Sequence, residues 1–268
     1  MTNERLPQTI VAVTRQPSAS LARCELLHLP RREIDYAQAR RQHSRYEDEL
    51  SDLGCVLLRL PPAAELPDAV FVEDTCLVLD DLAIVARPGV PSRRPETEPL
   101  AGLLGAFRPV AFIEAPGTLD GGDVVRLGNR VFVGLSSRTN GAGLEQLAAH
   151  LVPRGYTVHP VSLNGCLHLK TALTAVSPDT LLVNRSWVAA EAFAAARTID
   201  VHPDEPFGAN ALLVNGTVLH SASHPRTRER LEGSGIRVRP VEFSELEKAE
   251  AGVTCCCVLF DAGLPPRR

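Results

Sequence analysis

Apolar residues in this chain fall into short runs, and turn-forming residues separate one run from the next. Residues 124–127 and 130–134 are two such runs, joined by a Gly-Asn pair, and residues 156–161 form a third. Short runs rich in β-branched residues and bounded by turn signals are typical of strands. Residues 141–151 between them carry apolar side chains at helical spacing. This segment is therefore predicted to fold as strand, turn, strand, helix and strand.

The same order of elements recurs at intervals of roughly fifty residues, which is typical of a closed radial array. The asparagine–glycine pair at 215–216 is a strong hairpin signal. The sequence therefore predicts an α/β protein built from repeated units. The other units are predicted from strands at 75–79, 82–86 and 109–113 with a helix at 99–107, from strands at 172–176 and 180–183 with a helix at 189–197, and from strands at 209–214, 217–220 and 236–240 with a helix at 227–232.

The two ends of the chain are predicted to complete the last unit together. Residues 252–260 form an apolar run that contains three consecutive cysteines, and residues 9–14 form another run near the start. Because side chains alternate across a strand, Cys255 and Cys257 are expected to share one face while Cys256 points to the core. Neighbouring cysteines on one strand are poorly placed to bond each other, so at least one thiol is expected to be free. An amphipathic helix at 35–53 and a strand at 55–60 follow.

A polar motif begins each predicted unit: Glu73 with Asp74, then Asp120, His168 and finally Cys255. In a radial array these segments converge on the centre. Cysteine attacks as the thiolate, and a nearby histidine held by a carboxylate is the pattern of nucleophilic catalysis. A buried cysteine is also a common core residue, so this pattern alone leaves both interpretations open.

The adjacent acids Glu73 and Asp74 are costly to bury unless a cation pairs with them. That cation is either a local arginine or a group of a substrate. Arg93 and Arg138 lie in loops that follow strand pairs, and the arginine fork matches a carboxylate. Acids and arginines together describe a pocket for a zwitterion with a second cationic end, which arginine or a derivative satisfies.

Composition excludes several classes of function. The net charge is −4 and aromatic residues make up 4% of the chain, which argues against a nucleic-acid partner. No apolar run reaches the roughly 20 residues of a membrane helix, and the N-terminus lacks the apolar segment of a signal peptide. Seven cysteines, three of them contiguous, indicate a reducing cytoplasm rather than a disulfide framework. One catalytic domain over residues 1–268 is expected, with a short disordered tail at 264–268.

Short motifs occur along the chain in this order: Phe71-Val72-Glu73-Asp74, Arg87-Pro88-Gly89 with Ser92-Arg93-Arg94, Leu119-Asp120-Gly121-Gly122-Asp123, Arg138-Thr139-Asn140, Leu167-His168-Leu169-Lys170 and Thr254-Cys255. Together they resemble the dimethylarginine dimethylaminohydrolase family, and the resemblance spans residues 11–259. It implies a five-fold pseudosymmetric α/β propeller, the pentein fold. It also implies hydrolysis of asymmetric dimethylarginine or monomethylarginine to citrulline and dimethylamine or methylamine, through a covalent S-alkylthiouronium on cysteine and without metal or organic cofactor.

The resemblance also implies residue roles. Cys255 would be the nucleophile, His168 would protonate the leaving amine and then activate water, and Asp120 would orient His168. The partner would be a small-molecule substrate bound by a monomer or a homodimer. The implied substrate-binding residues are Asp74 with Glu73 for the guanidinium, Arg93 and Arg138 for the α-carboxylate, Asp68 and the backbone near Ala249 and Glu250 for the α-amino group, and Leu26 in a mobile lid.

Three alternatives remain open from the sequence. An arginine deiminase-like hydrolase acting on unmethylated arginine differs only in the room it leaves for methyl groups. A cysteine-based metal or redox sensor built on residues 255–257 is a different class, but strand alternation prevents all three thiols from meeting one ion. A catalytically inactive arginine binder is disfavoured by the intact cysteine, histidine and aspartate set.

Overall fold

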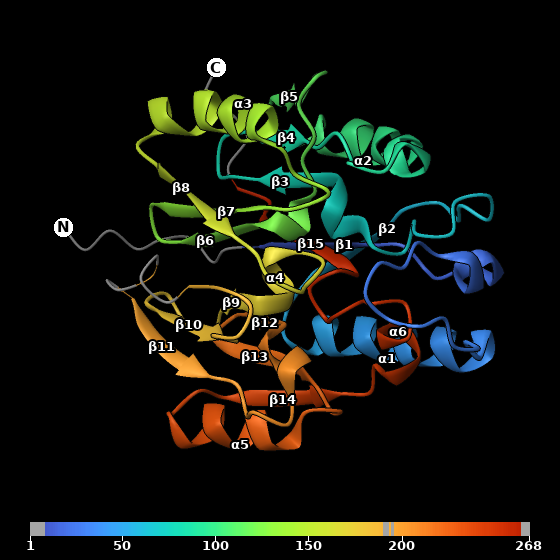
Figure 1. Ribbon diagram of the computed structural model, residues 1–268. Helices are drawn as coiled ribbons and strands as arrows, with labels where there is room; N and C mark the ends of the chain where they lie inside the picture. The colour runs from blue at the N-terminus through green and yellow to red at the C-terminus, as the bar shows by residue number, and fades with distance from the viewer. Residues whose placement is uncertain (1–8, 190–192, 194–195, 264–268) are drawn as a thin grey trace.

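Five three-stranded sheets surround a common centre in the computed structural model, which describes residues 9–189, 193 and 196–263 (Figure 1). In every sheet the first two strands are antiparallel and the third is parallel to the second. The strand-turn-strand hairpins of the sequence pattern are thus the first two strands of each unit. The predicted radial array of α/β units, a five-fold propeller, is confirmed.

Four of the units follow one another along the chain. The first has β3 (Cys76–Val78), β4 (Ala83–Val85), α2 (Thr97–Leu104) and β5 (Val110–Phe112), and the second has β6 (Val124–Leu127), β7 (Arg130–Leu135), α3 (Gly141–Leu151) and β8 (Thr157–Ser162). The third has β9 (Leu173–Ala175), β10 (Thr180–Val183) and β11 (Arg197–Asp200), and the fourth has β12 (Ala211–Val214), β13 (Thr217–Ser221), α5 (Pro225–Gly233) and β14 (Val238–Val241).

The fifth unit joins the two ends of the chain, as predicted. Its strand β15 (Cys257–Asp261) pairs antiparallel with β1 (Ile10–Thr14), which pairs in parallel with β2 (Val56–Arg59). Helix α1 (Tyr36–Asp52) begins where the Asp35 side chain accepts a hydrogen bond from the Gln38 amide. The sheet register therefore fixes the cysteine segment against the start of the chain.

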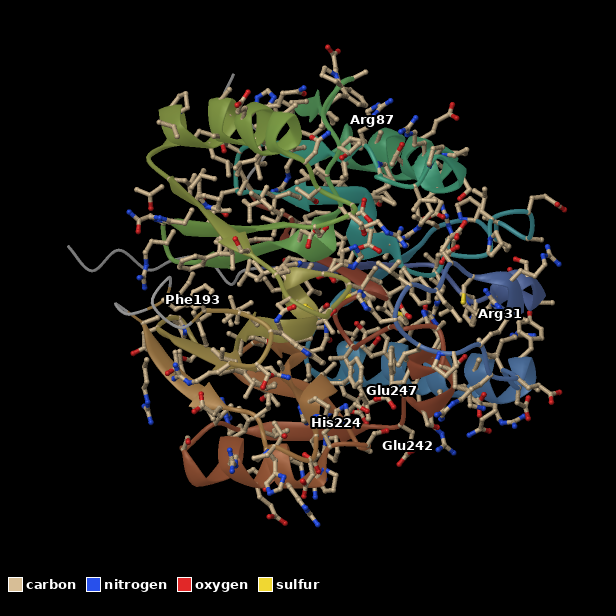
Figure 2. The ribbon with its side chains drawn as sticks, viewed as in Figure 1. Arg31, Arg87, Phe193, His224, Glu242 and Glu247 are labelled. Carbon is tan, nitrogen blue, oxygen red and sulfur yellow. The ribbon has the colours of Figure 1, made fainter. Side chains whose placement is uncertain are left out.

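Apolar cores lie between neighbouring units rather than at the centre. One cluster joins Leu79 and Ile84 of the first unit to Val131 and Leu147 of the second. Between the second and third units, the Phe193 ring, labelled in Figure 2, packs edge-on against Phe132 with the ring centroids 4.9 Å apart. Apolar burial thus holds adjacent units together. The polar residues that precede the first strands lie together around two cavities near the axis.

Short helical segments carry these polar residues into the centre. The acid pair lies in η2 (Val72–Thr75), the aspartate motif in η4 (Gly121–Asp123), and His168 caps α4 (Leu169–Ala172). Glu73 and Asp74 form this 3₁₀ turn directly ahead of β3. The remaining short segments are η1 (Ala19–Arg23), η3 (Pro91–Glu96), η5 (Val152–Arg154), η7 (Pro206–Ala209) and α6 (Ser244–Glu247).

The cysteine segment also departs from the prediction. Residues 253–256 form a turn, in which the Cys255 amide donates to Gly252 O at 3.1 Å, and the strand starts only at Cys257. Cys255 and Cys257 therefore do not share a strand face. Cys256 is buried in the core as expected, Cys257 is buried as well, and Cys255 is partly exposed. All seven cysteines are free thiols.

Two further expectations lie largely or wholly outside the described residues. Most of the helix predicted at 189–197 falls on positions that the structure does not describe, and Arg197 itself begins strand β11. The disordered tail predicted at 264–268 also lies outside them. Within the described residues, no helix is long and apolar enough to cross a membrane.

Candidate active site

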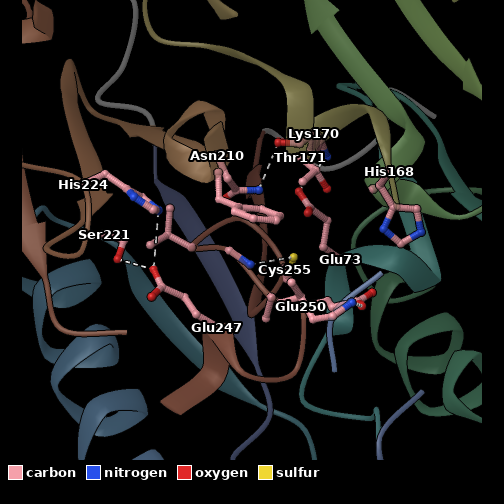
Figure 3. Close-up of a pocket in the computed structure, with 16 residues that line it drawn as sticks. Glu73, His168, Lys170, Thr171, Asn210, Ser221, His224, Glu247, Glu250 and Cys255 are labelled. Carbon is pink, nitrogen blue, oxygen red and sulfur yellow. Dashed lines mark hydrogen bonds and ion pairs between the residues drawn. The ribbon is translucent and has the colours of Figure 1, made fainter. Parts of the chain in front are cut away.

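Cys255 and His168 line the same two adjoining cavities near the propeller axis. Cavity A also contains Asp68, Asp74, Arg93 and Arg138. Cavity B is lined by the same thiol and imidazole, but otherwise includes Lys170, His224 and Glu247 (Figure 3). The sequence segments predicted to converge are thus brought together at one place.

His168 is held between two aspartates. Its Nε2 atom lies 3.1 Å from Asp120 Oδ2, and its Nδ1 atom lies 3.9 Å from Asp74 Oδ1. Asp120 is fully buried and also accepts a hydrogen bond from the Gly89 amide at 3.0 Å. Burial alone would lower the pKa of His168, but Asp74 and Asp120 outweigh it and raise the pKa to about 9. The imidazole is therefore a proton-bearing cation at neutral pH.

The Cys255 thiol is held in a turn that lines the same cavities as His168. Its Sγ atom accepts a hydrogen bond from the Gly252 amide at 3.3 Å, and its carbonyl accepts one from the Glu73 amide at 3.1 Å. Burial, followed by the charges of Glu73 and Asp74, raises the pKa of Cys255 to about 12. In the ligand-free protein the sulfur is thus a neutral thiol. A cation placed between the sulfur and the acids would lower that pKa and favour the thiolate.

The two acids of η2 differ in their partners. Asp74 Oδ2 accepts from Arg93 Nη1 at 2.7 Å. Burial opposes ionisation of Asp74, yet His168 and Arg93 lower its pKa to about 2. Glu73 accepts from Lys170 Nζ and from the Thr254 hydroxyl, each at 2.6 Å. Burial nevertheless raises the pKa of Glu73. Asp74 is therefore ionised at neutral pH, whereas Glu73 forms an ion pair with Lys170.

Glycines allow the acid pair and the imidazole to approach this closely. A Cβ atom on Gly121 would lie 2.1 Å from the Glu73 carbonyl oxygen. One on Gly122 would lie 2.7 Å from Asp74 Oδ1 and 2.8 Å from His168 Nδ1. All three distances are shorter than any van der Waals contact allows. The two glycines of the Asp-Gly-Gly-Asp motif are therefore required by packing at the site.

Two residues that support the site were not predicted from the sequence. The Asn210 side-chain oxygen accepts a hydrogen bond from the Thr254 amide at 3.0 Å, and its side-chain nitrogen donates one to the Thr254 hydroxyl at 3.0 Å. Asn210 therefore fixes the turn that carries Cys255. Lys170 neutralises Glu73. Asn210 precedes β12 as the other polar motifs precede their strands. Its position in the repeat is the signal that could have identified it.

The two arginines of cavity A are held differently. Arg93 Nη1 pairs with Asp74, its Nε and Nη2 atoms donate to Glu96 at 3.2 Å and 2.9 Å, and Nη2 also donates to the Phe71 carbonyl at 3.2 Å. Arg138 Nη1 lies 3.9 Å from Asp120 Oδ2 and has no hydrogen-bond partner although it is buried. A buried guanidinium nitrogen without a hydrogen bond is costly unless a ligand satisfies it. Nη1 of Arg138 can therefore donate a hydrogen bond to a ligand.

The segment from Cys24 to Arg31 covers cavity A and is fastened by two carboxylates. Asp68 accepts a hydrogen bond from the Glu25 amide at 3.1 Å. Glu250 accepts from the Leu27 amide at 3.0 Å and the His28 amide at 2.6 Å, and its own backbone has a φ of 58°. Ala249 and Glu250 line cavity A. Leu26 packs against the core instead, and it is Glu25 that lines the cavity.

One group of potential metal ligands occurs among the described residues. Single donor atoms of Asp74, Asp120 and His168 lie within 4.8 Å of one another. Arginines already pair with both of these carboxylates, and a protonated imidazole cannot bind a metal. The described residues offer no such three-ligand group that includes a cysteine. The donor set therefore fits an ion-pair network better than a metal site, and it gives no support to the sensor hypothesis.

Comparisons with known proteins agree with this geometry. Residues 66–207 match the family profile described as arginine deiminase. The N(G),N(G)-dimethylarginine dimethylaminohydrolase of Pseudomonas aeruginosa is 39% identical over 228 residues, or 84% of this chain and 90% of that protein. The enzyme of the same name from Streptomyces coelicolor is 38% identical over 251 residues, covering 92% and 95%.

Solved structures give the same relationship. The Pseudomonas aeruginosa enzyme, as a cysteine-to-serine variant in complex with citrulline, matches with a TM-score of 0.90 at 36% identity, covering 95% of this chain and all of that one. The N-terminal domain of the cyanobacterial arginine dihydrolase ArgZ matches with a TM-score of 0.82 at 18% identity, covering 93% and 97%, and so shares the fold. The chain therefore belongs to the dimethylarginine dimethylaminohydrolase family.

Proposed function

We propose that the protein hydrolyses Nω-methylated arginines to citrulline and dimethylamine or methylamine, with Cys255 as the nucleophile. The observation that carries this proposal is the meeting of a partly exposed thiol and a cationic imidazole in a cavity that Arg138 also lines, with one guanidinium nitrogen that has no hydrogen-bond partner. A ligand with a carboxylate at one end and a planar cation at the other complements both ends. Relatives of that name, one of them solved with citrulline, support the same activity.

Substrate binding uses the charges of cavity A. Arg138, with Arg93 beside it, receives the α-carboxylate, and Asp68 and the backbone near Ala249 and Glu250 receive the α-amino group. The guanidinium then lies against Asp74, whose low pKa keeps it anionic. Leu26 contributes to closure through its place in the covering segment. The bound cation offsets the acids that hold the pKa of Cys255 high, so the thiol gives up its proton to solvent and the thiolate forms in the complex.

The chemistry proceeds in two halves. The Cys255 sulfur attacks the guanidinium carbon and forms a C–S bond, and the C–N bond to the methylated nitrogen then breaks. His168 gives its proton to that nitrogen, and the amine leaves behind a covalent S-alkylthiouronium. The neutral imidazole next takes a proton from water, whose oxygen attacks the same carbon. The C–S bond breaks and citrulline is released, while Asp120 holds the imidazole in place throughout.

Unmethylated arginine is the main alternative substrate. It would bind the same charges and release ammonia through the same steps. The relatives with the higher identities carry the dimethylarginine name, whereas the arginine dihydrolase shares only the fold. We therefore favour the methylated substrate for this chain.

The same observations bear on organisation and location. We infer one catalytic domain, since residues from all five units build the site or fix the turn that carries Cys255. A cytoplasmic location is supported by seven free thiols, which a reducing compartment preserves. The small-molecule chemistry needs no second chain, so a monomer and a homodimer are both compatible with it.

Parallel assays of citrulline release test the proposal. Asymmetric dimethylarginine, monomethylarginine and arginine are supplied to the wild type before and after thiol alkylation. We expect citrulline from the methylated substrates, and none after alkylation or from Cys255→Ser. Comparable kcat/KM for all three substrates would favour the deiminase alternative. Citrulline release that survives alkylation would refute the thiol mechanism.

A further inference from the structure

Cavity B is a second space beside the reacting groups that the proposed substrate does not fill. Cys255 and His168 line both cavities. Arg93, Arg138 and Asp68, which bind the amino-acid end of the proposed substrate, line cavity A and not cavity B. Cavity B encloses about 720 Å³, part of it open to solvent, against about 310 Å³ for cavity A. A substrate lying along cavity A therefore directs its guanidinium end, and the nitrogen that leaves, toward cavity B.

Cavity B also leads to the surface at a different place. Leu29, Phe207 and Glu247 line both cavity B and an outer groove that continues between the covering segment and α6. Phe207 is exposed at this rim, where its ring packs edge-on against Trp187 at 5.1 Å. A small molecule formed at Cys255 thus has a route outward that does not pass Arg138 or Asp68.

The wall of cavity B includes a carboxylate without a cationic partner. Glu247 accepts hydrogen bonds from the Ser221 and Ser223 hydroxyls, and among the described residues no lysine or arginine pairs with it. His224 Nε2 lies 3.8 Å from Glu247 Oε1 (Figure 3). Burial, only partly offset by Glu247, lowers the pKa of His224, so this neighbour is neutral at pH 7. The negative charge of Glu247 is therefore available to a ligand.

We propose that cavity B is a binding and exit site for the alkylammonium product, which leaves past Phe207 and Glu247 while the amino-acid part of the substrate stays in cavity A. An alkylamine is protonated at neutral pH, as lysine is. A carboxylate and an aromatic face are the groups that bind such a cation. The inference rests on the proposed function, because it assumes that the amine is released at Cys255.

A binding experiment on a variant without turnover tests this directly. The methyl resonance of dimethylammonium is followed by saturation-transfer NMR with Cys255→Ser, with and without saturating citrulline. Because the ligand has only three heavy atoms, we expect a Kd of about 1 mM. Separate sites predict that this Kd stays the same, within about threefold, when citrulline is bound. Citrulline binding itself shows that the variant is folded.

Two further variants in the same background locate the amine. Glu247→Gln is expected to weaken dimethylammonium binding about three- to tenfold while citrulline affinity is unchanged. Glu242→Gln is the matched control, because Glu242 is an exposed acid on the same stretch of chain outside both cavities (Figure 2). It should alter neither affinity.

The outcomes separate the inference from the proposed function. Competition between dimethylammonium and citrulline, the absence of amine binding in both conditions, or an unchanged Kd in Glu247→Gln would each overturn the exit site. If wild-type enzyme nevertheless releases citrulline from dimethylarginine, the proposed function stands. If wild-type enzyme releases none, the proposed function fails independently of where the amine binds.

Discussion

The Nε2 atom of His168 lies 3.1 Å from Oδ2 of Asp120, and Asp120 is completely buried. The carboxylate has few other ways to be satisfied, since its remaining close contacts are the Gly89 amide and, at 3.9 Å, Arg138. The pair therefore fixes both the orientation and the proton of the imidazole. The proposed mechanism uses both, first to protonate the leaving amine and then to activate water.

Asp120→Asn should therefore impair chemistry more than binding. The amide keeps a similar shape but removes one of the charges that hold the pKa of His168 at about 9. We expect kcat to fall by roughly 10²- to 10⁴-fold with KM nearly unchanged. Steady-state kinetics and an NMR titration of His168 measure the two effects. A normal kcat together with a lowered pKa would show that the imidazolium proton is not used.

Lys170→Met should destabilise the protein and displace the turn that carries Cys255. The substitution leaves the buried Glu73 without its cation, which costs on the order of 3 kcal/mol of unfolding free energy. Glu73 also accepts a hydrogen bond from the hydroxyl of Thr254, the residue before the nucleophile, so kcat should fall as well. Urea unfolding and citrulline assays measure both. Lys248→Met is the matched control, since its pair with Glu245 is more exposed and should cost at most about 1 kcal/mol.

Glu250→Ala should open the segment over cavity A. The carboxylate accepts hydrogen bonds from the Leu27, His28 and Leu29 amides, and alanine removes all of them. We expect faster hydrogen exchange at these amides and a kcat/KM about tenfold lower, with KM more affected than kcat. Glu242→Ala serves as the control. Unchanged exchange at residues 27–29 would mean that other contacts hold the segment.

His43 should make the protein sensitive to acid. It is fully buried in α1, neither ring nitrogen has a hydrogen-bond partner, and burial lowers its pKa to about 4. Its unfolded pKa is roughly 6.5, so the unfolded chain binds a proton that the folded state excludes. The stability that His43 contributes is thus complete above about pH 6.5 and is lost as the pH falls toward 4.

His43→Leu removes this titration. Between about pH 7 and pH 4 the unfolding free energy of the variant should fall by on the order of 3 kcal/mol less than that of the wild type. Urea unfolding at a series of pH values measures the difference. The exposed His28 offers a control, because His28→Leu should leave the wild-type pH dependence in place. Identical curves for His43→Leu and wild type would contradict the assignment.

The sequence pattern predicted most of the propeller because each hairpin has a strong local signal. The Asn215–Gly216 turn and the Gly141–Leu151 helix occur where the pattern places them. The turn at 253–256 was missed because its cause is tertiary. Tyr46 binds the Val253 carbonyl at 2.8 Å, and Asn210 binds Thr254, and neither contact has a local signature.

The site was predicted in part. The polar motifs identified Cys255, His168, Asp120 and the acid pair, because radial repeats bring equivalent positions to one axis. The ion pairs of Arg93 with Asp74 and Glu96 were not predictable. The sequence does not say whether a buried acid pairs with a local arginine or with a ligand. Asn210 lacked any charge that would have singled it out.

Mass spectrometry of the acid-quenched enzyme during turnover tests the central claim most directly. Wild-type protein mixed with asymmetric dimethylarginine should carry a substrate-derived mass on the peptide that contains Cys255, at Cys255 itself and not at Cys256 or Cys257. The adduct should appear within the first turnover, disappear as substrate is consumed, and be absent from Cys255→Ser. Rapid turnover without any such adduct, or an adduct on another cysteine, would contradict a covalent mechanism through Cys255.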